Sequence, residues 1–156
     1  MANAHPPAPP TFKNMVITFN TSGDDKDPDT RLEIFIIKYD GDPGQAYLDI
    51  QGSGFGDPST RQFTVPARTA FPLSELAQEE ISLKIAPNGH DTWKFGFSAV
   101  LNFSDGTVAY LSVPYDSLNQ DNRQHFYSLA AAHVVPSPNP EAFHIRTAAA
   151  KAKTAA

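Results

Sequence analysis

The segment from Thr92 to Phe103, TWKFGFSAVLNF, restricts the possible folds of this chain more than any other part of it. Every second position carries an apolar side chain, namely Trp93, Phe95, Phe97, Ala99, Leu101 and Phe103. Successive side chains of a β-strand point to opposite faces, whereas a helix would spread these residues around its axis. The segment therefore predicts a long strand with one face in a hydrophobic core, and we expect Trp93 to be buried at its start.

The same alternation recurs in shorter segments along the chain. They are 15–20, 31–39, 46–52, 61–65, 81–85 and 107–113, with 125–129 as a further candidate. Clusters of Gly, Pro, Asn and Asp separate them, as is typical of tight turns. Seven to eight such strands predict an all-β fold, an antiparallel β-sandwich. The segment 72–80, PLSELAQEE, predicts a short helical turn between two of the strands.

The length and composition favour one globular domain. The chain has 156 residues, of which 40% are hydrophobic and 19% charged, enough to build a core without disulfides. We expect a proline-rich flexible N-terminus over 1–11 and a single sandwich domain over 12–135. We expect a linker and an extended tail rich in Ala and Lys over 136–156.

Several classes of function are disfavoured by the sequence. A net charge of −5 without any basic run disfavours nucleic-acid binding. The lack of cysteine excludes thiol catalysis and thiolate zinc sites. No apolar run reaches the roughly 18 residues of a membrane span, and the N-terminus lacks a signal sequence. We therefore expect a cytoplasmic protein, with non-classical release left open. No motif such as HExxH, GxSxG or a P-loop is present, so we expect no enzyme.

The segment 23–30, GDDKDPDT, carries four aspartates in one short loop. If the connection 66–80 returns to its own end of the sandwich, the loops 21–30, 52–60 and 87–92 share the opposite end. Their oxygen-bearing side chains are Asp24, Asp25, Asp27, Asp29, Asp57, Asn88 and Asp91. Ca²⁺ is bound by six to eight such oxygens, so the loops predict a calcium site. A solvated turn, with Asp as a turn former, is the alternative.

Two segments resemble PLAT (lipoxygenase-homology) domains, over about residues 15–113. VITFNTSGDDKDPDTRLEIFI is similar to the first strand, acidic loop and second strand of that family, and ELAQEEISLKIAPNGHDTWKFGFSAVLNF to a later part. The resemblance implies a C2-like sandwich that binds calcium in rim loops and docks on membranes or protein partners. It also implies metal ligands in the first loop, with Asn88 and Asp91 in the second, and Phe55 as the apolar tip. The ligands implied in the first loop are Asp24, Asp25, Asp27 and Asp29.

Three kinds of function stay open at this stage. The first is a calcium-dependent module that binds lipid or protein. The second is a calcium-dependent lectin, for which an exposed aromatic side chain such as Phe55 or Tyr115 would serve as a stacking surface. The third is a structural or assembly protein in which the cation only fixes loops. The sequence does not specify the oligomeric state.

Overall fold

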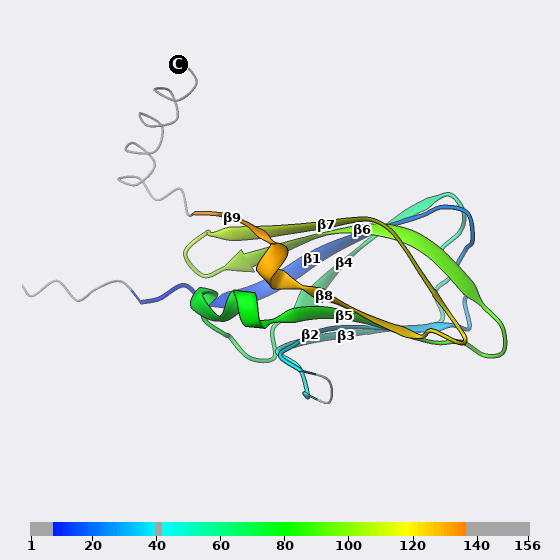
Figure 1. Ribbon diagram of the computed structural model, residues 1–156, viewed down its shortest axis with the longest axis horizontal. Helices are drawn as coiled ribbons and strands as arrows, with labels where there is room; N and C mark the ends of the chain where they lie inside the picture. The colour runs from blue at the N-terminus through cyan, green and yellow to red at the C-terminus, as the bar shows by residue number, and fades with distance from the viewer. Residues whose placement is uncertain (1–7, 40–41, 137–156) are drawn as a thin grey trace, which may run out of the picture.

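The computed structural model describes residues 8–39 and 42–136 as a sandwich of two antiparallel sheets (Figure 1). The antiparallel β-sandwich predicted from the sequence is confirmed. The strands are β1 (Phe12–Thr21), β2 (Arg31–Ile37), β3 (Ala46–Ile50), β4 (Ser59–Pro66), β5 (Glu80–Ala86), β6 (Thr92–Phe103), β7 (Val108–Asn119), β8 (Gln124–Ser128) and β9 (His133–Val135). One sheet has the order β4-β1-β6-β7-β9 and the other β3-β2-β5-β8.

The core lies between the two sheets and contains the predicted face of β6. Its alternating apolar side chains are all buried, and Trp93 is fully buried. The indole Nε1 of Trp93 donates a hydrogen bond of 2.9 Å to the Thr21 hydroxyl, so its one polar atom is satisfied. The inward residues Met15, Ile17 and Phe19 of β1 are fully buried as well. Period-two alternation thus identified the core correctly on both central strands.

Gly96 allows β6 and β7 to pack closely where their register shifts, between Phe95 and Phe97. A Cβ atom added to Gly96 would lie 2.5 Å from the carbonyl oxygen of Pro114. Real Cβ atoms essentially never come so close to a backbone oxygen, so any side chain at this position would push the two strands apart. The glycine is therefore required by space at this bulge.

The ends of the chain differ from the sequence-based expectation in two places. The short strand β9 pairs with β7 through Val108–Tyr110 and was not predicted, because three residues after an Ala run give little periodic signal. At the N-terminus, contacts begin inside the predicted flexible segment, since Pro10 O accepts a 2.9 Å hydrogen bond from Leu73 N. Most of the predicted tail, 137–156, lies outside the described residues.

The connections fall at the two ends of the sandwich. The long connection 67–79, with the 3₁₀ helix η1 (Leu73–Gln78), stays at the end where β1 begins, as predicted. The turn 104–107 lies there too, because Ser104 N donates to Thr11 O. A second 3₁₀ turn, η2 (Leu129–Ala131), follows β8. Among the described residues, no helix is long and apolar enough to cross a membrane.

The outer faces of the two sheets differ in charge. On the four-stranded sheet, Arg31 binds Asp49 at 2.7 Å and Tyr47 donates to Glu33 at 2.9 Å. On the five-stranded sheet, the four rows of outward positions that contain Asn14, Val16, Thr18 and Asn20 carry no Asp, Glu, Lys or Arg on β1, β4, β6 and β7, and Lys94 of β6 lies beyond these rows, next to the rim. The positions in these rows are Asn14, Val16, Thr18, Asn20, Thr60, Gln62, Thr64, Pro66, Gly96, Ser98, Val100, Asn102, Val108, Tyr110 and Ser112. We call this surface the neutral face.

Candidate functional site

The loops 22–30, 51–58 and 87–91 meet at the end of the sandwich opposite η1, on the right in Figure 1, and we call this end the rim. Asp91 Oδ2 accepts hydrogen bonds from the Thr30 hydroxyl at 2.6 Å and from Asp27 N at 3.1 Å. Lys26 and Phe55 pair through two backbone hydrogen bonds of 3.0 and 2.9 Å. The predicted meeting of these three loops is therefore confirmed. The loop 120–123 joins them, because Gln120 Oε1 accepts from Asp91 N.

Lys26 fills the interior of the rim, which sequence reasoning did not anticipate. The side chain is only 1% exposed, although lysine is seldom buried without partners. Its Nζ donates to the carbonyl oxygens of Thr30 at 2.8 Å and Asp27 at 3.2 Å, and to that of Ser53. The acceptors belong to two different loops. One ammonium group thus connects the acidic loop to the β3–β4 connection.

Aromatic and charged groups complete the surroundings of Lys26. The ammonium lies 4.6 Å from the centre of the Phe55 ring, within the range of a cation–π contact. Arg61 lies near the same ring and donates to Gly54 O at 3.0 Å. Burial lowers the pKa of Lys26, and Arg61 lowers it further, while Asp91 opposes both. In the rim interior, the negative charge of Asp91 therefore offsets part of the repulsion between the positive charges of Lys26 and Arg61.

Phe55 corrects one expectation. The sequence suggested Phe55 as an exposed aromatic at the rim, either an apolar tip or a stacking surface. The structure buries it completely against Phe19, Phe63 and Trp93. The reason is local, because the backbone bridge to Lys26 turns the side chain of Phe55 inward. Tyr115, the other aromatic candidate, is 61% exposed.

The predicted acidic residues divide into paired and unpaired groups. Asp24 binds the Lys94 ammonium at 2.8 Å, and Asp91 is buried within the hydrogen bonds described above. No hydrogen bond or ion pair within residues 8–39 and 42–136 engages the carboxylates of Asp25, Asp27 and Asp29. We call these three the outer carboxylates. The charge of Asp91 raises the pKa of Asp27, followed by burial and by the charges of Asp25 and Asp29.

Asp57 and Asn88, the remaining predicted rim residues, are both exposed. Asp57 precedes Pro58 in the β3–β4 connection, and Asn88 lies in the β5–β6 turn next to Gly89, which has a φ of 97°. Neither side chain has a hydrogen bond within the described part of the chain. The structure therefore puts them at the rim without bringing them to Asp91.

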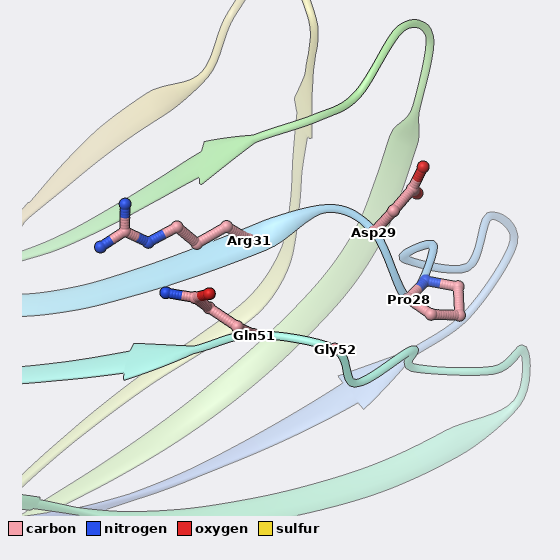
Figure 2. A pocket seen from close by; sticks show the side chains of 5 residues that line it. All are labelled: Pro28, Asp29, Arg31, Gln51 and Gly52. Carbon is pink, nitrogen blue, oxygen red and sulfur yellow. The ribbon is translucent and has the colours of Figure 1, made fainter.

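An open groove of about 420 Å³ lies beside the acidic loop, lined by Pro28, Asp29, Arg31, Gln51 and Gly52 (Figure 2). Arg31 and Gln51 both donate to Asp49 Oδ2, at 2.9 and 2.6 Å, so the guanidinium charge is compensated. In Figure 2, the Asp29 side chain points away from these two residues. The groove offers hydrogen-bonding groups beside a free carboxylate.

In residues 8–39 and 42–136, no group of three or more His, Asp or Glu side chains is already arranged to hold a metal ion. The fit to calcium differs between two positions of the rim. The interior is taken by the Lys26 ammonium, and Asp91 is used by Thr30 and Asp27 N. The outer carboxylates are unpaired and lie in one loop, so they are the residues that could hold Ca²⁺. Their role as metal ligands stays a prediction.

A second polar cluster connects β7 of the five-stranded sheet to β8 of the four-stranded sheet. Asp116 Oδ2, on β7, is bonded to His125 Nδ1 at 2.8 Å and to the Tyr127 hydroxyl, both on β8. His125 Nε2 is 2.7 Å from the Asn122 side-chain nitrogen. Both ring nitrogens of the histidine are thus engaged, which suits a structural tie better than a catalytic base.

Comparisons with protein-family models, with curated proteins and with solved structures found no match to this chain.

Proposed function

We propose that this protein is a non-catalytic binding module that holds a calcium ion at the outer carboxylates and docks on its ligand through the rim. The observation that carries the proposal is the crowding of Asp25, Asp27 and Asp29, whose carboxylates have no bonded partner in the described part of the chain. Repulsion from Asp91, followed by burial and by repulsion from Asp25 and Asp29, raises the pKa of Asp27. A bound cation would relieve this repulsion.

The chemistry of the loop favours calcium over other common cations. Ca²⁺ accepts six to eight oxygens at about 2.3–2.6 Å in flexible geometry, which an exposed loop can provide by small movements. Mg²⁺ requires a nearly ideal octahedron and retains its waters. Three carboxylates with neighbouring carbonyls and water form a suitable set for Ca²⁺. The resemblance of this segment to the calcium loop of PLAT domains points in the same direction.

The kind of ligand follows from what the rim presents. With Phe55 buried, the described part of the rim offers no large exposed aliphatic or Phe side chain for insertion into a bilayer. A calcium ion at the outer carboxylates would instead bridge to oxygens of the partner, such as a lipid phosphate, a protein carboxylate or a sugar hydroxyl. Docking by such a bridge depends on calcium and weakens at high ionic strength.

A calcium-dependent lectin is the second candidate, and Tyr115 favours it. Its ring is 61% exposed, and it lies on β7 two residues before Ser117, the register partner of Lys94, which pairs with Asp24 of the acidic loop. An exposed tyrosine near a cation is a suitable stacking surface for a sugar ring whose hydroxyls bind the ion. Binding to a glycan array in calcium, lost in EGTA and in Tyr115→Ala, would support this reading over lipid docking.

The test is the melting temperature in millimolar CaCl₂ and in EGTA, for the wild type and for Asp29→Asn. Binding to the native state alone adds about 2.7 kcal/mol at a hundredfold excess over Kd, so the wild type should melt several degrees higher in calcium. Asp29→Asn should lose most of that gain. Asp105→Asn changes the charge equally at the opposite end and should keep it. Equal melting temperatures of the wild type in the two buffers would remove calcium from the proposal.

The docking step is measured separately, by sedimentation with anionic phospholipid vesicles in calcium and in EGTA. We expect calcium-dependent sedimentation that Asp29→Asn weakens. A protein that binds calcium but no vesicle or glycan would be the structural alternative, in which the cation only fixes the loop.

A further inference from the structure

We propose that the Lys26 ammonium is a built-in cation that replaces a bound metal ion in the rim interior and orders the rim loops without any metal. The inference concerns the interior of the rim and is independent of the calcium proposed for the outer carboxylates. It rests on the contacts of one side chain. Nζ binds carbonyl oxygens of Asp27, Thr30 and Ser53, drawn from the β1–β2 and β3–β4 connections.

The number of acceptors identifies the protonated form. A neutral amine has two N–H donors, whereas an ammonium has three. Three carbonyl oxygens surround Nζ, and a carbonyl oxygen can only accept. The geometry therefore requires –NH₃⁺ with every hydrogen used, and the Phe55 ring lies on a further side at 4.6 Å. Carbonyl oxygens that converge on one positive centre are also the arrangement that binds a metal ion in loops.

The position of Lys26 explains how one group orders several loops. Its backbone N–H and carbonyl oxygen both form hydrogen bonds with the backbone of Phe55. Its ammonium donates to the carbonyl oxygen of Thr30, and the hydroxyl of the same threonine donates to Asp91. The three loops are thus connected through a residue that cannot dissociate. Two consequences follow for metal binding. The rim should be ordered in the absence of calcium, and calcium should be confined to the outer carboxylates.

The test is chemical rescue of Lys26→Ala in EGTA, followed by thermal melting and by hydrogen exchange of the Phe55 amide. The substitution removes a propylammonium group, so n-propylammonium chloride is the probe. Tetramethylammonium chloride is the control salt, because it has the same charge and no N–H donor. Lys94→Ala is the matched variant, since it removes a surface lysine that pairs with Asp24.

We expect Lys26→Ala to melt several degrees below Lys94→Ala and to exchange the Phe55 amide about tenfold faster or more. Propylammonium should reverse part of both changes, and tetramethylammonium should not. Equal stability of the two variants, or equal effects of the two salts, would overturn the inference. If Lys26→Ala does not fold, Lys26→Met keeps the apolar stem and removes the donors. Wild-type protection of the Phe55 amide in Lys26→Met would overturn the inference equally.

Discussion

Glu79 should make the stability of this protein decrease as the pH rises through neutrality. The residue lies between η1 and β5, its side chain is fully buried, and neither carboxyl oxygen has a hydrogen-bond partner in the described part of the chain. Burial raises the pKa of Glu79 from 4.5 to about 7, with Lys38 opposing the rise and Asp42 and Glu75 adding to it. The folded protein therefore holds a proton that the unfolded chain releases.

The magnitude follows from linkage. Between pH 4.5 and about 7 the folded state binds the proton at Glu79 more tightly than the unfolded state does. The free energy of unfolding therefore falls over this interval, by about 3 kcal/mol at about 1.36 kcal/mol per pH unit. Below this interval both states are protonated, and above it both are ionised. Above about pH 7 the loss of unfolding free energy is therefore complete, and the ionised carboxylate of Glu79 is buried without a hydrogen bond in the described part of the chain.

Glu79→Gln tests this directly, because glutamine has a similar shape and does not titrate. The variant should match the wild type near pH 4.5 and be more stable by about 3 kcal/mol at pH 8. Urea unfolding, followed by fluorescence of the single tryptophan, measures both values. Glu75→Gln is the control, since it loses the ion pair with Lys38 and should gain nothing at pH 8. An equal difference between Glu79→Gln and the wild type at both pH values would refute the reasoning.

Three other substitutions have defined expectations. Trp93→Ala should lower the free energy of unfolding by about 3–5 kcal/mol, measured by circular dichroism in urea. Gly96→Ala should cost about 1–3 kcal/mol through overpacking, whereas Gly56→Ala, whose Cβ meets open space, should change urea stability little. Asp91→Asn should lower the free energy of unfolding by about 1–3 kcal/mol in EGTA, because it weakens the charge-assisted hydrogen bonds that the buried carboxylate accepts. Asp29→Asn changes an exposed carboxylate and should not lower it. Equal losses in the two variants would mean that Asp91 does not act as a buried acceptor.

The sandwich and the grouping of loops could be predicted because both depend on period-two alternation and on strand direction. The interior of the rim could not. Lysine normally lies in water, so Lys26 between two aspartates is typical of a solvated turn. The signal that could have located it was spatial, since the acidic loop and the segment around Phe55 were expected at the same end. A contact between Lys26 and Phe55 at that end could have been considered on this basis. Phe55 was misplaced for the same reason, as no pattern of spacing shows the backbone bridge that turns it inward.

The neutral face gives the molecule an uneven electrostatic surface. The Arg31–Glu33 and Arg31–Asp49 ion pairs lie on the outer face of the four-stranded sheet, whereas the outer carboxylates and the Lys94–Asp24 ion pair lie at the rim. At physiological ionic strength, exposed charges act over only about 8 Å. The electrostatic repulsion between two molecules in a crowded solution therefore depends on which of their surfaces face each other. Approach through the neutral face meets the least repulsion, and added salt changes it least. Contacts between molecules at high concentration should therefore favour one relative orientation.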